Sequence, residues 1–282
     1  MTATDRYIDW VGKKDCSNAL VTASQANALA VTLDRDDPPL KDGDTIPQGW
    51  HLFYFHEVVK LSETGPDGHP KRGEFLPPID LPRRMWAGTK AIYHRPIHVG
   101  ELIKKTTTIE AVSPKVGKTG DLVFLQLKHE IEGSSGIAVT EIQDVVYREA
   151  AKNSVSSDNL PTAPLPAVWS RKIEPTPVLL FRFSALTMNS HRIHYDRKYV
   201  TEIENYPGLL VHGPLTQILL MDLFRRQLPD KLLNSISVRA VSPLYDTHRF
   251  KVQGCVNHDE NSAKLWAVNH NDKLAMILEA SF

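Results

Sequence analysis

The stretch HGPLTQILLMDLFRRQL, residues 212–228, has the spacing of a helix that is buried along one side. Its apolar residues recur every three or four positions, and Pro214 is favoured in the first turn of a helix. The residues that keep this period are Leu215, Ile218, Leu219 and Leu223. Four segments with the alternation of strands follow the helix. They are residues 235–241, 249–257, 263–269 and 274–281. This order predicts one central helix wrapped by an antiparallel sheet, an α+β unit.

The first half of the chain repeats this order. Residues 17–34 carry a helix-like pattern, and the apolar segment WHLFYFHEVV begins at Trp50. A polar insertion rich in Gly and Pro, residues 62–80, separates that segment from four predicted strands. The strands are residues 84–94, 102–112, 122–132 and 137–148. We therefore expect a duplicated unit, each copy with one central helix and its own antiparallel sheet.

The two copies differ where chemistry is concerned. A constant shift along the chain superposes Thr32 on His194 and Trp50 on His212. Histidines therefore stand in the second copy where the first has residues that do not titrate near neutral pH. If one half carries out a reaction, we expect it to be the second.

The composition changes sharply between the two copies. Residues 151–177 are rich in Ser, Asn and Pro and lack the period of a helix or a strand, which is typical of a linker. The predicted organisation is an N-terminal unit of residues 1–150, this linker, and a C-terminal unit of residues 178–282.

Composition also limits the class of function. The 33 Lys and Arg residues balance the 33 Asp and Glu residues, whereas binding to nucleic acid or to a membrane surface favours a basic excess. No apolar run approaches the ~20 residues that span a bilayer, and residues 1–15 lack the apolar core of a signal peptide. Cys16 and Cys255 are too few for a disulfide scaffold. We expect a soluble, cytoplasmic protein.

Polar side chains gather in two short loops of the second half. The segment NSHRIHYD, residues 189–196, contains Asn189, His191 and His194, and His212 precedes the predicted central helix. Histidine titrates near neutral pH and can carry a proton, and an asparagine amide can orient a water molecule. These residues predict a proton-transfer site. The alternative is that the histidines are surface or helix-capping residues.

Gly213 stands at the expected start of the central helix. The first N–H groups of a helix have no acceptor within it, and the helix dipole favours negative charge there. The Gly213 amide is therefore a candidate donor to a developing oxyanion. The alternative is an ordinary helix start in a tight turn.

These motifs resemble the MaoC-like, R-specific enoyl-CoA hydratase (hydratase 2) family, whose loop motif ends Asp-x-Asn-Pro-(Leu/Ile/Val)-His. Ile193-His194 matches the end of that motif, and His212-Gly213 resembles the family's His-Gly at the central helix. Residues 84–88, RMWAG, and the duplicated order are similar to its hydroxyacyl-thioester dehydratase branch, which includes bacterial mesaconyl- and itaconyl-CoA hydratases.

The resemblance implies a double hotdog fold, a CoA or acyl-carrier thioester as substrate, and reversible addition of water. It implies that His194 moves the proton and that the Gly213 amide holds the thioester carbonyl. The family's catalytic Asp falls at Asn189, which cannot act as a base but can hold the attacking water. This departure predicts an altered active site, and a site without activity is the alternative.

The residues expected to bind the substrate are His191, Arg192, His212, Arg182 and Trp86. Arg192 is expected to pair with a carboxylate of the acyl group, and Arg182 with CoA phosphates. Trp86 is expected to line an acyl pocket in the N-terminal half. For the arginines the alternative is a solvated surface position, and for Trp86 it is core packing.

The favoured function is hydration of a short dicarboxylic enoyl-CoA such as itaconyl-CoA or mesaconyl-C4-CoA. The alternatives are a 3-hydroxyacyl-thioester dehydratase of fatty-acid synthesis, a hotdog thioesterase, and a protein that binds acyl-CoA without catalysis. No phosphate-binding loop or dinucleotide fingerprint is present. We expect no cofactor, no metal, and no nucleic-acid or membrane partner; the fold allows a homodimer.

Overall fold

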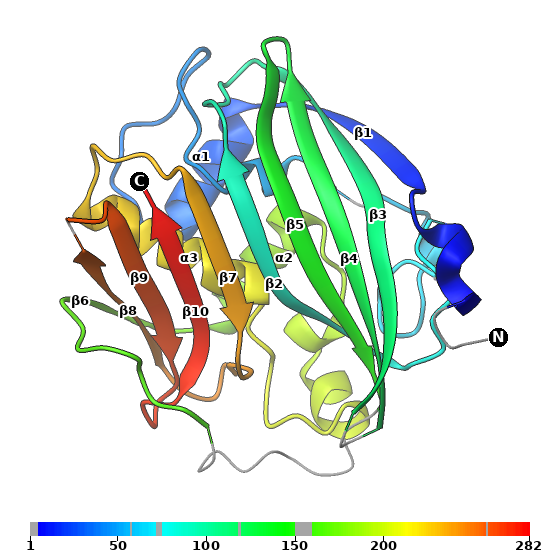
Figure 1. Ribbon diagram of the computed structural model, residues 1–282. Coiled ribbons are helices and arrows are strands. Elements are labelled where there is room, and N and C mark those ends of the chain that lie inside the picture. The colour runs from blue at the N-terminus through cyan, green and yellow to red at the C-terminus, as the bar shows by residue number, and fades with distance from the viewer. Residues whose placement is uncertain (1–4, 57, 72–74, 118–119, 150–159, 258) are drawn as a thin grey trace.

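The computed structural model describes residues 5–56, 58–71, 75–117, 120–149, 160–257 and 259–282. One long antiparallel sheet has the helices packed on a single face (Figure 1). The strands are β1 (Lys14–Leu20), β2 (Arg83–Tyr93), β3 (Leu102–Gly117), β4 (Gly120–Gly133), β5 (Gly136–Arg148), β6 (Trp169–Ile173), β7 (Ser235–Ala240), β8 (Phe250–Asn257), β9 (Ser262–Val268) and β10 (Leu274–Ser281). The helices are α1 (Ala23–Thr32), α2 (Pro177–Thr187) and α3 (Gly213–Gln227). Short helical turns are η1 (Asp5–Trp10), η2 (Trp50–Phe53), η3 (Leu61–Glu63), η5 (Arg192–His194) and η6 (Tyr199–Ile203).

The strand order confirms the predicted duplication. The sheet runs β1-β3-β4-β5-β2-β7-β10-β9-β8-β6, so the second half repeats the order of the first in reverse. The two halves meet where β2 pairs with β7, between Gly88 opposite Arg239 and Ile92 opposite Ser235. The fold is an α+β double hotdog in which both sheets are continuous.

Two edge strands differ from the sequence prediction. The expected helix at 17–34 is wrong in its first part, because β1 ends at Leu20 and α1 begins at Ala23. Within the predicted linker, residues 169–173 form β6 and pair with β8. Both strands lie at the ends of the sheet, where exposed side chains weaken the alternation that marks a strand. Residues 150–159 of the linker lie outside the described residues, and the domain boundaries stay a prediction.

The superposition of Thr32 on His194 is also wrong. Thr32 is the last residue of α1, whereas His194 lies beyond the end of α2, in η5. In addition, the described residues of the first copy contain no long helix in the place of α3: its apolar segment forms the turn η2 there. The described part of the fold therefore contains one long central helix, α3, shared by both halves.

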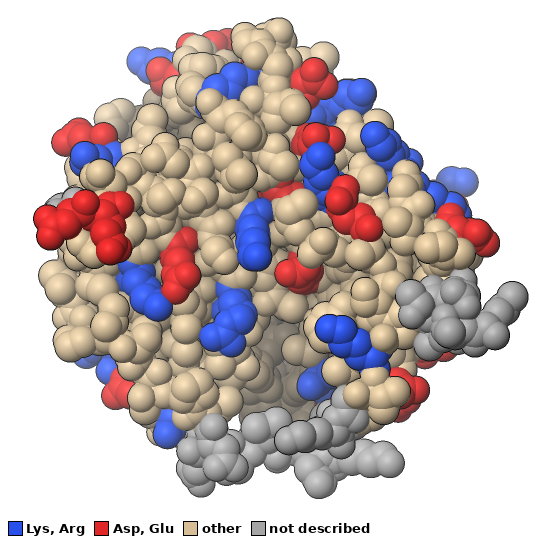
Figure 2. Space-filling model, viewed as in Figure 1, with Lys and Arg blue, Asp and Glu red and all other residues tan. Residues whose placement is uncertain are grey.

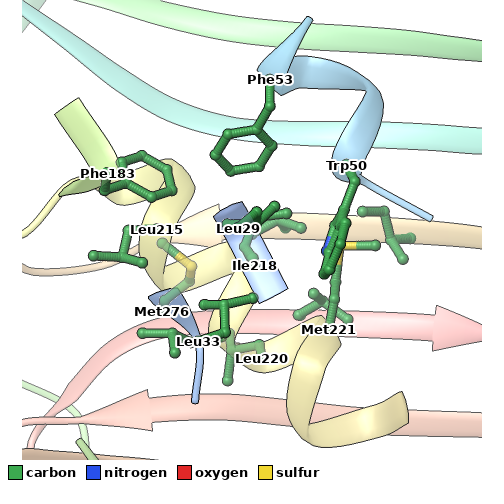
Figure 3. Close-up of a cluster of buried hydrophobic side chains, with 14 of the residues drawn as sticks. Leu29, Leu33, Trp50, Phe53, Phe183, Leu215, Ile218, Leu220, Met221 and Met276 are labelled. Atoms are coloured by element: carbon green, nitrogen blue, oxygen red, sulfur yellow. The ribbon is translucent and has the colours of Figure 1, made fainter. Parts of the chain in front are cut away.

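The core gathers around α3. Figure 3 shows Trp50 and Phe53 of η2 and Phe183 of α2 facing α3 residues, with Met221 beside Trp50. Because η2 comes from the first half and α3 from the second, burial of these apolar side chains holds the halves together. No helix among the described residues is long and apolar enough to cross a membrane.

Charges are mixed on the face of the sheet opposite the helices. Figure 2 shows Lys and Arg interspersed with Asp and Glu among the described side chains of this view. The view gives no reason to expect a polyanionic partner on this face, and the absence of nucleic-acid binding stays a prediction.

Candidate active site

The start of α3 provides an amide that faces away from the helix interior. His212 is the N-cap residue, Gly213 is the first helical residue, and Pro214 follows it. Pro214 has no N–H, and the N–H of Gly213 has no acceptor within the helix. A Cβ at Gly213 would lie 2.7 Å from Cε3 of Trp86. Glycine is therefore required here by the close approach of the indole.

His194 is held in one tautomer. Its Nδ1 lies 2.7 Å from the carbonyl oxygen of Leu210, and a carbonyl oxygen only accepts hydrogen bonds. The proton is therefore on Nδ1, and Nε2 is left as an acceptor. The side chain is 7% exposed. Burial lowers the pKa of His194 to about 4, although the bond to Leu210 raises it. His194 is thus a neutral base at neutral pH.

His212 stacks on His194 at the same end of α3. The two ring centroids are 3.6 Å apart and the planes are 17° from parallel. Nε2 of His212 lies 2.9 Å from Oγ of Ser184, while its buried Nδ1 has no hydrogen-bond partner among the described residues. Burial lowers the pKa of His212 well below its usual value. Because His212 immediately precedes Gly213, this stack places the imidazole of His194 at the start of α3.

His191 also contacts His194, so that His212, His194 and His191, together with His69, form a row of histidines in which each ring lies beside the next. Its ring centroid lies 5.5 Å from that of His194 and 4.0 Å from that of His69. Burial lowers the pKa of His191 to about 2. Its backbone N–H donates to Oδ1 of Asn189, which leaves the amide nitrogen of Asn189 as that side chain's donor group. The structure therefore brings together four of the predicted residues, Asn189, His191, His194 and His212.

Two of the predicted arginines have other surroundings. The guanidinium of Arg192 binds Asp196 at 3.0 and 2.7 Å, donates to the carbonyl of Pro66, and lies over the ring of Tyr199. A substrate carboxylate at Arg192 would have to displace Asp196. Arg182 is exposed on α2.

Arg84 is not among the predicted site residues. It is half-buried in β2 without an ion pair or hydrogen bond among the described residues. Its partner across the sheet is Tyr147, and that of Trp86 is Val145, so Arg84 shares the face on which Trp86 meets α3. The positive charge of Arg84 contributes to the low pKa of His191. Arg84 is therefore a cation within electrostatic range of His191.

The inserted segment of the first half reaches this site. Asp67 and His69 come from residues 62–80, and the Asp67 carbonyl accepts a hydrogen bond from the N–H of Arg192. In the sequence, the pair Asp67-Gly68 is typical of a turn and does not by itself indicate a site. One feature of the sequence could have indicated their role: Asp67, Gly68 and His69 stand together in the inserted segment that the second copy lacks. Ligand atoms of Asp67, His69 and His191 lie within 4.8 Å of one another, close enough for a cation.

A cavity of about 360 Å³ lies farther along α3, lined by Trp50, His51, Tyr93, Met221 and Arg225 among others. Trp50 thus borders a cavity, whereas Trp86 packs against Gly213. Met221 is eight residues beyond Gly213, about 12 Å along the helix. An acyl pocket in the N-terminal half stays a prediction.

Comparison with known proteins gives the family. Residues 49–246 match the model of hydroxyacyl-thioester dehydratase type 2. The chain belongs to this family. It is 37% identical over 259 residues, 92% of each chain, to mesaconyl-C(4)-CoA hydratase of Chloroflexus aurantiacus. It is 26% identical to the mitochondrial hydroxyacyl-thioester dehydratase type 2 of Schizosaccharomyces pombe, covering 79% of this chain and 80% of that one.

Solved structures agree with the fold of this type 2 dehydratase. A MaoC-like dehydratase from Phytophthora capsici superposes with a TM-score of 0.70, covering 100% of this chain and 98% of that one at 13% identity. A Mycobacterium tuberculosis protein with a double hotdog fold gives 0.60, covering 96% and 95% at 11% identity. The predicted family, fold and class of enzyme, a hydro-lyase acting on enoyl or hydroxyacyl thioesters, are confirmed.

Proposed function

We propose that this enzyme adds water reversibly to a short dicarboxylic enoyl-CoA, with mesaconyl-C4-CoA and itaconyl-CoA as the first candidates. The observation that carries the chemistry is the fixed tautomer of His194, which leaves Nε2 as a base beside the start of α3. The identity to a mesaconyl-C(4)-CoA hydratase supports the class of substrate.

In the proposed reaction, the thioester carbonyl accepts a hydrogen bond from the Gly213 amide. Nε2 of His194 takes a proton from water, and the oxygen of that water forms a bond to the β-carbon. The electron pair of the double bond moves to the thioester, whose enolate oxygen the amide and the dipole of α3 stabilise. The His194 imidazolium then returns the proton to the α-carbon. Dehydration is the same sequence in reverse.

We propose Arg84, rather than Arg192, as the residue that recognises the second carboxylate of the substrate. Arg192 is already neutralised by Asp196, while Arg84 is half-buried near the histidines without a counter-ion among the described residues. A cation in such a place gains a hydrogen-bonded partner when an anionic substrate binds.

The test compares the rates of hydration of mesaconyl-C4-CoA, itaconyl-CoA and crotonyl-CoA. Each rate is measured as the loss of absorbance of the enoyl thioester. Arg84→Gln should lower kcat/KM for the dicarboxylic substrates by about 10- to 100-fold, the ~1.5–3 kcal/mol of a hydrogen bond to a charged group, and leave crotonyl-CoA nearly unaffected. Arg192→Gln, the matched control, should affect all three substrates alike. An enzyme that prefers crotonyl-CoA or longer chains contradicts the proposed substrate and favours 3-hydroxyacyl-thioester dehydration in fatty-acid synthesis.

A cytoplasmic location and a homodimer stay predictions. Sedimentation of the purified chain and fractionation of its source cells would test them.

A further inference from the structure

Residues 65–70 of the inserted segment lie across the loop that carries the histidines. The N–H of Arg192 donates to the Asp67 carbonyl at 2.8 Å, and Oγ of Ser190 donates to the Gly68 carbonyl at 2.6 Å. Gly68 has φ of 90°, and a Cβ there would lie 2.0 Å from the Ser190 carbonyl oxygen. Only glycine allows this approach, so main-chain contacts fix the segment against the site.

Asp67 and His69 form a carboxylate–imidazole pair at this junction. One carboxylate oxygen of Asp67 lies 3.1 Å from the backbone N of His69, and the other lies 3.4 Å from Nδ1 of its ring. A carboxylate accepts hydrogen bonds, so the pair favours the tautomer of His69 with its proton on Nδ1. The ring of His69 in turn packs on His191.

The reaction creates a charge that the row of histidines cannot balance by itself. His194 becomes an imidazolium when it takes a proton, among rings that burial keeps neutral. Asn189 carries no charge. Asp67 is ionised: burial raises its pKa, but the hydrogen bonds from His69 outweigh this and lower the pKa to about 2. Among the described side chains with the largest effect on the pKa of His191, Asp67 is the one anion.

We propose that Asp67, held in place by its contacts with His69, is a positioning residue of the hydration step: its negative charge, reaching the site along His69 and His191, stabilises the positive charge that His194 acquires. The inference rests on the proposed function for the substrate used to test it. It explains why the N-terminal half carries an insertion that the C-terminal half lacks: the insertion supplies the anion beside Asn189, His191, His194 and His212, which all come from the C-terminal half.

A bound cation is the competing use of Asp67, His69 and His191. Both oxygens of Asp67 already face donors of His69, the backbone N–H and Nδ1 of the ring. The rings of His69 and His191 also pack against each other at 4.0 Å. These contacts favour a hydrogen-bonded imidazole over a metal ligand.

The experiment measures kcat and KM of Asp67→Asn, Asp67→Glu and His69→Gln against pH, with mesaconyl-C4-CoA and crotonyl-CoA. Glu63→Gln is the matched control, because Glu63 is an exposed carboxylate of the same segment that contacts Lys60. Asp67→Asn should lower kcat by about 10- to 100-fold, less than the ~10²–10⁴-fold of a direct proton carrier, with KM nearly unchanged. Asp67→Glu should restore part of the loss.

The pH profile separates an electrostatic role from a packing role. Removing a nearby anion disfavours the protonated imidazole, so the acid limb of kcat should move to lower pH in Asp67→Asn and stay in place in Glu63→Gln. Nitrogen-15 spectra of labelled histidine should show His69 protonated on Nδ1 in the wild type and a mixture of tautomers in Asp67→Asn.

Four outcomes overturn the inference. The first is an Asp67→Asn enzyme that keeps more than half of the wild-type kcat, and the second is an equal loss of kcat in Asp67→Asn and Asp67→Glu. The third is an acid limb of kcat that does not move in Asp67→Asn. The fourth is a stoichiometric metal whose removal by a chelator abolishes turnover. A wild-type enzyme that hydrates neither substrate counts instead against the proposed function, and the nitrogen-15 spectra then test the Asp67–His69 pair alone.

Discussion

The indole of Trp86 lies against Gly213 so closely that a Cβ on the glycine would be 2.7 Å from Cε3 and 3.1 Å from Cζ3. Trp86 belongs to the N-terminal half and Gly213 begins the central helix of the C-terminal half. The indole is fixed from the other side by its Nε1–H, which donates to Oγ1 of Thr89 at 3.1 Å. The position of the proposed oxyanion donor therefore depends on both halves.

Gly213→Ala should destabilise the enzyme by about 1–3 kcal/mol, the cost of overpacking, and reduce turnover because the amide moves. A smaller neighbour should relieve the clash, so Trp86→Leu combined with Gly213→Ala should lose less stability than the two single changes added together. Urea unfolding of the four proteins measures this coupling. Strict additivity would mean that the indole does not limit the glycine.

His194→Gln should lower kcat by about 10²- to 10⁴-fold, because the proposed base is lost while the buried volume is nearly kept. In the wild type the neutral imidazole is required, so activity should fall as pH drops through the pKa of His194, about 4. The rate should thus be flat around neutral pH rather than declining near 6.5, the usual value. A pH profile of the hydration rate checks both points, and a limb near 6.5 would contradict the buried neutral state.

The strands β2 to β5 and β7 to β10 and the helix α3 were predictable because their apolar periods are long and local. The edge strands β1 and β6 were not, since pairing with β3 and β8 rather than burial makes them strands. The loops holding Asn189, His191, His194 and His212 were visible as a polar cluster. Asp67 and His69 were missed because their contact with that cluster spans more than 120 residues. Local spacing carries no signal at that distance.

Asp222 should be a main electrostatic link between the halves. Asp222 lies on α3 and is only 4% exposed. Its carboxylate binds three arginines: Arg35 of the first half, Arg171 of β6 and Arg226 of α3. Removing the anion leaves partly buried arginines uncompensated, so Asp222→Asn should cost about 3–5 kcal/mol of unfolding free energy.

The matched control is Asp37→Asn, since Asp37 pairs with Arg35 and Arg225 but is 42% exposed. It should cost only about 0–1 kcal/mol. Urea unfolding at neutral pH measures both variants. Equal effects would show that burial of Asp222 does not set the strength of this network.

Acid should destabilise the fold well before carboxylates are protonated. Burial lowers the folded-state pKa of His194 to about 4 and that of His212 well below 6.5, so the unfolded chain binds more protons than the folded one under mild acid. Stability should therefore be complete above the unfolded value of 6.5 and fall as pH decreases below it. Each histidine contributes up to about 1.4 kcal/mol per pH unit, and for His194 the decline ends near pH 4.

Unfolding free energies measured by urea between neutral pH and pH 5 should show a slope that His194→Gln reduces by one proton. An unchanged slope in His194→Gln would mean that His194 is not buried in its neutral form.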